Sequence, residues 1–226
     1  MKLSEENRLL LLLARFPYDK KTDEEIKAIL EKSTVDWNLF FKIGIEQKIS
    51  MIVFHRIQKF IDFVPNEEFA GFRAKCLQQL RNNLLNTKEL LRIYEAAEKH
   101  GLYIISYKGA VFADEVYGGI NLRASGDIDF WYAFEDTPIV KKIMRDEGYE
   151  LVINYNKIQN FFFTKIDCEY HFYKRFEKNG QRVLIEPHHH LINHFLKKKP
   201  TKEDKDNTLF VIITHNQMEK FNDFKA

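Results

Sequence analysis

The hydrophobic pattern of this chain changes once, at His100-Gly101, and that change limits the folds open to it. Before it, apolar residues recur at steps of three and four, which is the spacing of one helical face. After it, short apolar runs alternate with turn residues, which predicts strands and short helices. We therefore expect an all-helical N-terminal region followed by a mixed α/β part, and the predicted fold class is α+β with a mixed sheet.

Start signals support several helices in residues 1–100. Thr22 followed by Glu25 reads as a capping box, and Asp36 is placed to cap a helix that begins at Trp37. The stretch 67–98 carries regularly spaced leucines and no proline, so it predicts one long helix or two.

Strands and two helices are expected in residues 101–196. The predicted helices are 110–117, which Gly118-Gly119 ends, and 137–147, which Thr137 caps, with Pro138 at its first position and Gly148 as its stop. The predicted strands are 103–106, 127–132, 149–154, 160–164, 168–176 and 182–188, with a turn at Asn179-Gly180 before the last. Residues 197–226 read as a charged loop and a tail that forms a last strand or a short helix.

Composition excludes several classes of protein. The 226 residues are 45% hydrophobic and 30% charged, which is typical of a globular chain and not of a disordered one. The chain has 35 basic and 33 acidic residues. This near balance gives no indication of a nucleic-acid partner. Cys76 and Cys168 lack metal-ligand spacing and fit a reducing cytoplasm. The apolar run Leu9–Ala14 is far shorter than the roughly 20 residues that cross a bilayer, so we expect a cytoplasmic protein without a membrane partner.

The segment Gly126-Asp127-Ile128-Asp129-Phe130 carries the strongest chemical signal. On a strand, residues two apart share a face, so both carboxylates point one way and the apolar residues point into the core. Mg²⁺ prefers such oxygen ligands together with substrate phosphates. Glu186, near the end of another strand, is the candidate third acid of a two-metal site. The alternative is that these acids cap turns or face water.

A turn that suits phosphate lies upstream of the acids. Gly109 allows close approach of the backbone, the following helix offers free amides, and Lys108 adds a positive charge. Arg123 could clamp a phosphate and Ser125 could donate a hydrogen bond to one. For either basic residue taken alone, a solvated surface charge is the favoured alternative.

The run His188-His189-His190 has two interpretations. Glu186, His188 and His190 alternate onto one face and could bind a transition metal. We favour the other interpretation, in which His188 orients Glu186 or contacts phosphate while His189 and His190 face solvent. Three consecutive histidines on a strand cannot all share one face.

Two further groups have plain structural interpretations, which we prefer. Glu169 and His171 read as a hydrogen-bonded pair on a half-exposed sheet. The nearby aromatic residues could stack a base but are expected in the core: Phe161, Phe162, Phe163, Tyr170, Phe172 and Phe176.

Taken in order, these motifs resemble those of the uncharacterised bacterial nucleotidyltransferase family within the polymerase-β-like superfamily. The resemblance covers roughly residues 90–191 and rests on Lys108-Gly109-Ala110, Tyr117, Arg123, Ser125 to Asp129, and Ile185 to His188. It implies a polymerase-β-like nucleotidyltransferase domain over 101–196. The chain departs from the wider superfamily, whose turn is commonly Gly-Ser or Gly-Gly and lies closer to the acids. The resemblance also implies that 197–226 is a truncated helical region.

The resemblance also implies roles for single residues. The metal-binding and catalytic residues are expected to be Asp127, Asp129 and Glu186, with His188 in support. The nucleotide-binding residues are expected to be Lys108, Gly109, Arg123, Ser125 and Gly126.

The expected reaction is transfer of a nucleoside monophosphate from an NTP, such as ATP, to a hydroxyl or phosphate, with release of pyrophosphate. Two Mg²⁺ ions are expected, with Mn²⁺ as a substitute. The acceptor is a small molecule, a protein or an RNA end. Two alternatives remain: a non-catalytic interaction protein on the same fold, and a metal-dependent phosphohydrolase that uses the Asp, Glu and His residues.

Overall fold

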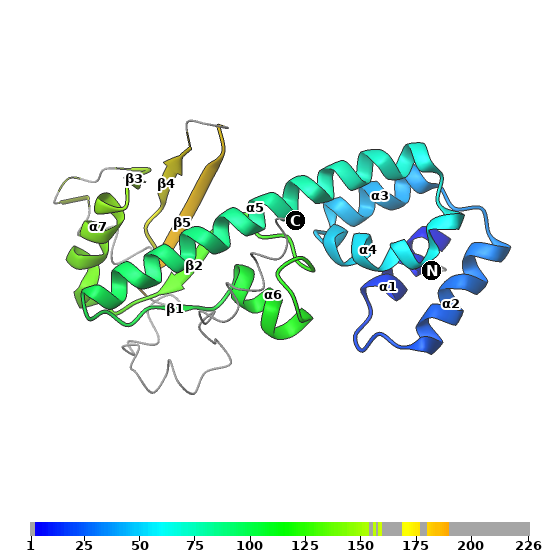
Figure 1. The fold of residues 1–226 in the computed structure, drawn as a ribbon, viewed down its shortest axis with the longest axis horizontal. Coiled ribbons are helices and arrows are strands. Elements are labelled where there is room, and N and C mark those ends of the chain that lie inside the picture. The colour runs from blue at the N-terminus through cyan, green and yellow to red at the C-terminus, as the bar shows by residue number, and fades with distance from the viewer. Residues whose placement is uncertain (1–2, 154–155, 157, 160–168, 177–179, 190–226) are drawn as a thin grey trace, which may run out of the picture. The chain divides into compact units, whose positions relative to one another are not determined.

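The computed structural model describes residues 3–153, 156, 158–159, 169–176 and 180–189 (Figure 1). The chain divides into two compact units. The N-terminal unit comprises Met1–Asn83 and Asn121–Ala124, and the C-terminal unit comprises Leu84–Ile120 and Ser125–Ala226. The expected α+β class with a mixed sheet is confirmed. No helix in the described part is long and apolar enough to cross a membrane.

Helices build the N-terminal unit, as predicted. They are α1 (Glu5–Ala14), α2 (Lys20–Lys32), α3 (Trp37–Glu46), α4 (Ser50–Ile57), the 3₁₀ helix η1 (Gln58–Phe63) and the first half of α5 (Asn66–Lys99). The proline-free stretch thus forms one helix, whose second half belongs to the C-terminal unit.

One of the two predicted caps in this unit is right. The Asp36 carboxylate accepts from the Leu39 amide at 3.0 Å and starts α3. The capping box at Thr22 is wrong, because α2 begins at Lys20 and Asp19 accepts from the Thr22 amide at 2.8 Å. Asp19 takes the N-cap position three residues earlier, since its carboxylate is a strong N-cap acceptor, and Thr22 lies inside the first turn.

A five-stranded sheet organises the C-terminal unit, in the order β1-β2-β5-β4-β3. The strands are β1 (Ile105–Ser106), β2 (Ile128–Trp131), β3 (Glu150–Leu151), β4 (Phe172–Arg175) and β5 (Arg182–His188). β2 and β5 pair in parallel and the other neighbours pair antiparallel. The predicted strand 182–188 is found with its bounds unchanged, whereas β1, β2, β3 and β4 are shorter than expected. The predicted strand 160–164 and the tail 197–226 lie outside the described residues.

The remaining helices of this unit are α6 (Gly109–Tyr117), the 3₁₀ helix η2 (Phe134–Asp136) and α7 (Thr137–Asp146). α6 ends as expected at Gly118, which adopts φ +81°. Thr137 does not cap α7. Its hydroxyl donates to the Phe134 carbonyl, Asp136 takes the cap position, and Pro138 fits the first turn because its missing amide has no helical partner there.

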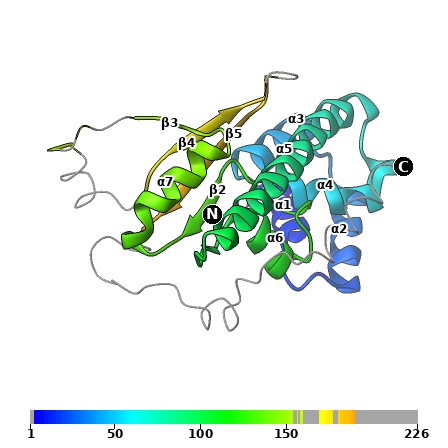
Figure 2. The same cartoon turned by 60° about the vertical axis from the view of Figure 1, so that its left-hand side comes forward.

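The second half of α5 and α7 lie along the sheet (Figures 1 and 2) and pack on one of its faces. The core between them contains Leu90, Ile93, Ile128, Phe130, Val140, Ile143, Met144, Tyr170, Phe172, Val183 and Ile185. Tyr170 and Phe172 are therefore core residues, as expected, whereas Phe161 to Phe163 lie outside the described residues. Because strand side chains alternate, the polar residues between these apolar ones lie on the opposite face.

Candidate active site

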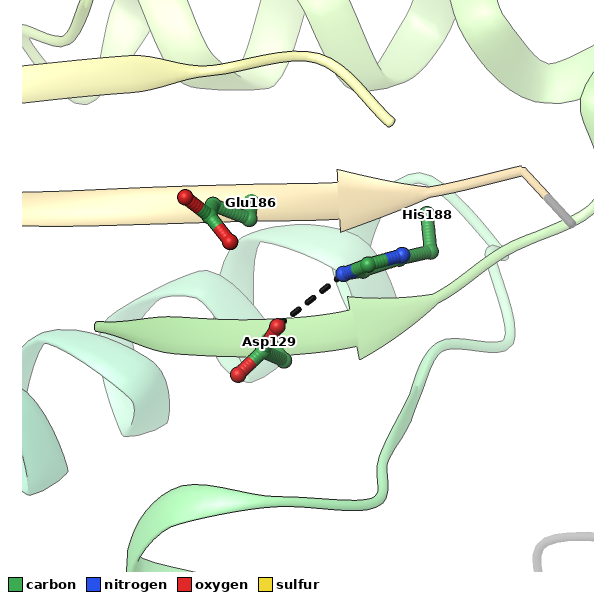
Figure 3. A group of neighbouring side chains, drawn as sticks. All are labelled: Asp129, Glu186 and His188. Atoms are coloured by element: carbon green, nitrogen blue, oxygen red, sulfur yellow. Dashed lines mark hydrogen bonds and ion pairs between the residues drawn. The ribbon is translucent and has the colours of Figure 1, made fainter. Parts of the chain in front are cut away.

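The parallel pairing of β2 and β5 brings two acids together. Asp129 is the register partner of Glu186, and His188 follows two residues later on the same face of β5 (Figure 3). One ligand atom from each of these three side chains lies within 4.8 Å of the other two. Neighbouring strands thus supply two carboxylates and an imidazole to one small area of the sheet.

Asp129 is almost fully buried and tightly held. Its Oδ1 accepts hydrogen bonds from Lys108 Nζ and from His188 Nε2, both at 3.0 Å. Burial alone would raise the pKa of Asp129, but these two hydrogen bonds and the charge of Lys108 outweigh it and leave the pKa lowered. Asp129 is therefore an ionised carboxylate whose Oδ2 has no hydrogen-bond partner in the described part of the chain.

Asp127 stands directly before β2 and is half-buried. Its side chain has no hydrogen bond or ion pair among the described residues. Its carbonyl oxygen accepts from the Ser125 hydroxyl at 2.9 Å, which fixes the turn that leads into the strand. An open carboxylate on a fixed backbone is suited to bind a cation.

Glu186 lies in a crowded acidic surrounding. Burial raises its pKa, and the charges of Glu169 and Asp127 raise it further. His171 opposes these effects, since its Nδ1 lies 3.0 Å from Glu186 Oε1. A cation beside Glu186 would relieve the same repulsion.

The predictions for the histidines need correction. His188 does not orient Glu186; its Nε2 contacts Asp129 and its Nδ1 contacts Glu169 Oε2, each at 3.0 Å. His189 does not face solvent, because it is 2% exposed and lies among the rings of Tyr132, Phe134 and Tyr170. Next to buried strand residues, an imidazole fills apolar space as an aromatic ring does. His190 lies outside the described residues.

The turn from β1 into α6 adjoins these acids. Lys108 occupies the N-cap position of α6 without a side-chain cap bond. Gly109 adopts φ +63°, and a Cβ there would lie 3.1 Å from Ser125 Oγ. Only glycine fits this backbone and this approach, so the amides of the first turn stay close to the Asp127 segment.

The other predicted nucleotide-binding residues are placed differently. The Ser125 side chain is buried and supports the Asp127 carbonyl, while Gly126 is exposed. Arg123 belongs to the N-terminal unit, where its carbonyl accepts from Asn83 Nδ2 at 2.7 Å. Roles of these three residues toward phosphate remain predictions.

The donor set fits a divalent cation. Asp127, Asp129 and Glu186 offer carboxylate oxygens, the ligands that Mg²⁺ and Mn²⁺ prefer. Lys108 and His188 both occupy Oδ1 of Asp129, which leaves Oδ2 for a ligand. The excess of acids around Glu186 supplies the charge that such an ion would neutralise.

Comparison with known proteins identifies the chain's family. Residues 33–213 match the model of a family described as uncharacterised nucleotidyltransferases. The chain belongs to this family. The expected resemblance is thus confirmed, and the chain is a nucleotidyltransferase family member with parts of both compact units inside the matched region.

Two other comparisons add little. The crystal structure of ANT(2")-Ia in complex with adenylyl-2"-tobramycin has 17% sequence identity and a TM-score of 0.31. That match covers 44% of this chain and 48% of the other, so it spans about half of either chain. A comparison with curated proteins found no match.

Proposed function

We propose that this protein transfers a nucleoside monophosphate from an NTP to a hydroxyl or phosphate acceptor, with Mg²⁺ or Mn²⁺ at Asp127, Asp129 and Glu186 and with pyrophosphate as the leaving group. ATP is the first NTP to test. The observation that carries the proposal is the register of β2 and β5, which sets Asp129 beside Glu186 in a chain of a nucleotidyltransferase family.

The carboxylates have distinct tasks in this proposal. Asp127, which is open, and Oδ2 of Asp129 face the incoming triphosphate with its cation. Bound divalent cations would neutralise charge on the phosphates and favour the attacking oxygen. Glu186 would position the acceptor's oxygen near the bound cation and help to deprotonate it.

The Lys108-Gly109 turn has the task of binding the leaving phosphates. The amides at the start of α6, which has no side-chain cap, attract anions, and Gly109 lets this turn approach the Ser125–Asp127 segment closely. Lys108 pairs with Asp129 at 3.0 Å, and in this proposal its ammonium moves to the triphosphate when a cation binds that carboxylate. Catalysis then consists of positioning and charge neutralisation.

The test is an analysis of products from the four NTPs, each labelled at the α-phosphate, with Mg²⁺ and separate pools of small metabolites, proteins and RNA as acceptors. We expect the label to move to one pool and pyrophosphate to appear in equal amount. Orthophosphate without a labelled acceptor would instead indicate the phosphohydrolase, and no turnover with any NTP would favour the interaction protein.

Matched variants show whether the proposed site is responsible. Asp127→Asn removes one ligand charge at constant volume, and we expect a loss of about a hundredfold or more in rate. Asp62→Asn, at an exposed position in η1, is the control and should retain full activity. Equal activity of the two variants would contradict the site.

A further inference from the structure

A second group of metal-binding side chains lies on the same face of the sheet. The β4–β5 ladder pairs Phe172 with Ile185, and an isolated bridge pairs Glu169 with His188. The same antiparallel register sets His171 opposite Glu186. Glu169 and His171 therefore face the proposed active site from the residues just before β4, and Glu186 belongs to both groups.

The second group is compact enough to coordinate one ion. One ligand atom each from Glu169, His171 and Glu186 lies within 4.8 Å of the other two. Metal–ligand bonds of about 2.0–2.2 Å bring ligand atoms within about 4.4 Å of one another, so a small side-chain movement closes the site. The side chains are 22%, 38% and 16% exposed, which leaves access for an ion from solvent.

His171 is better placed to bind a metal than His188. Both nitrogens of His188 contact carboxylate oxygens at 3.0 Å, and its side chain is only 6% exposed. His171 has one such short contact, to Glu186; its Nε2 lies 3.5 Å from Glu169 Oε1. That longer separation is the gap that an ion would bridge, because a cation accepts lone pairs from both the imidazole and the carboxylate.

The chemistry of the donors selects the ion. Mg²⁺ prefers oxygen ligands, whereas an imidazole with two carboxylates suits first-row transition metals. We propose that Glu169, His171 and Glu186 form a binding site for a divalent transition-metal ion, separate from the Asp127–Asp129 position and sharing Glu186 with it. The site depends only on the geometry of β5 and of the residues just before β4, and it stands whether or not nucleotide transfer is found.

The negative surroundings favour such an ion. Glu186 lies in the field of Glu169 and Asp127, and the ammonium of Lys108 lies in the field of the same two acids. A divalent ion bound between Glu169 and Glu186 would reduce the repulsion between their two negative charges.

The experiment is a titration of the whole protein with Co²⁺ in a large excess of Mg²⁺, followed by visible absorption. We expect one Co²⁺ per chain with the absorption bands of a site that includes nitrogen, because the excess Mg²⁺ occupies the carboxylate-only position. No Co²⁺ binding under these conditions would overturn the proposal.

Variants assign the bound Co²⁺ to this group. His171→Asn and Glu169→Gln should each weaken Co²⁺ binding by at least about tenfold. Two variants are used so that the test still holds if one of them does not fold. His55→Asn, an exposed histidine of α4, is the matched control and should bind as the original chain does. Unchanged binding in both folded variants would place the metal elsewhere and overturn the proposal.

Asp127→Asn separates this inference from the proposed function. We expect the variant to lose Mg²⁺-dependent nucleotide binding and to keep the Co²⁺ bands. If nucleotide binding is absent in the original chain but the Co²⁺ bands depend on His171, the proposed function fails and the metal site stands. Loss of the Co²⁺ bands in Asp127→Asn would show one common site and contradict the separate one.

Discussion

The ammonium of Lys108 pairs with the carboxylate of Asp129. This contact predicts that removal of Lys108 has opposite effects on the binding of Mg²⁺ and of Mg²⁺–NTP. Burial lowers the pKa of Lys108, but the adjacent Asp129 raises it above its usual value, so the ammonium is charged. Its side chain is 48% exposed, which limits the strength of the pair. The ammonium competes with a cation for Asp129 and, in our proposal, attracts phosphate.

Lys108→Ala should therefore bind Mg²⁺ alone more tightly and Mg²⁺–NTP less tightly. Loss of an exposed pair predicts a gain of about fivefold or less for the metal, and loss of a charge-assisted hydrogen bond predicts a decrease of roughly tenfold or more for the nucleotide. Calorimetric titration measures both. Lys142→Ala, from an exposed pair with Asp146, is the control. If both affinities rose or both fell, the proposed movement of Lys108 from Asp129 to the triphosphate would be refuted.

Gly109 offers a second test at the scale of one residue. Gly109 and Gly101 both have positive φ, +63° and +70°, so alanine at either strains the backbone by about 1–2 kcal/mol. Only at Gly109 would the new Cβ press on Ser125, at 3.1 Å from its Oγ; at Gly101 no atom lies within 4 Å. We expect both variants to lose stability in thermal unfolding, and only Gly109→Ala to lose NTP binding as well.

The site residues differ in how far the sequence could predict them. Alternation along one strand is local, so it correctly placed Ile128 and Phe130 in the core and Asp129 on the opposite face, while the shared face of Asp127 stays a prediction. The contact of His171 with Glu186 depends on the register between β4 and β5, which no local pattern in either strand states. His188 was assigned to the wrong acid for the same reason, since its partners come from β2 and from the residues before β4.

Among the elements, α5 is attached to the sheet through Glu89. This carboxylate is 1% exposed, accepts from Tyr149 Oη at 2.8 Å and Lys174 Nζ at 3.1 Å, and pairs with Arg92. Burial alone would raise the pKa of Glu89, but the hydrogen bonds and the charges of Lys174 and Arg92 leave it below its usual 4.5. Because the pKa is lowered in the folded state, Glu89 stabilises the fold above pH 4.5.

Glu89→Gln should lower the free energy of unfolding by about 1–3 kcal/mol at pH 7. The difference from the original chain should shrink as pH falls below 4.5, because the unfolded carboxylate takes up its proton first, and the contribution is lost once pH has fallen through the lower pKa of the folded state. Trp131 fluorescence in a Trp37→Phe background reports unfolding of the C-terminal unit. Glu95→Gln, exposed on the same helix, is the control. A difference that is constant with pH would contradict the role of the charge.

Element boundaries were predictable where one strong local signal exists. Gly118 ends α6, and the apolar alternation of 182–188 gives β5. The stretch 67–98 carried no breaker, so the choice between one helix and two needed the tertiary structure. The two-residue strands β1 and β3 are limited by pairing with their neighbours, which their own sequences do not specify.

For the whole molecule, the region that matches the family extends over parts of both compact units. The matched region 33–213 includes α3 to α5 as well as the sheet, so the family shares more than the strands that carry the acids. Within the C-terminal unit, helices cover one face of the sheet and charged residues occupy the other. That face concentrates acids, histidines and a lysine that pair with one another, and in our proposal it binds the cation and the nucleotide.

The central claim is that Asp127, Asp129 and Glu186 bind a nucleotide together with Mg²⁺. The most direct test measures thermal unfolding of the original chain, Asp127→Asn and Asp62→Asn with each NTP, with and without Mg²⁺. A ligand that binds only the folded state must raise the unfolding temperature. We predict that at least one NTP stabilises the original chain and Asp62→Asn only when Mg²⁺ is present, and that Asp127→Asn shows no such shift. Stabilisation of Asp127→Asn equal to that of the original chain, or no stabilisation by any NTP, would contradict the claim.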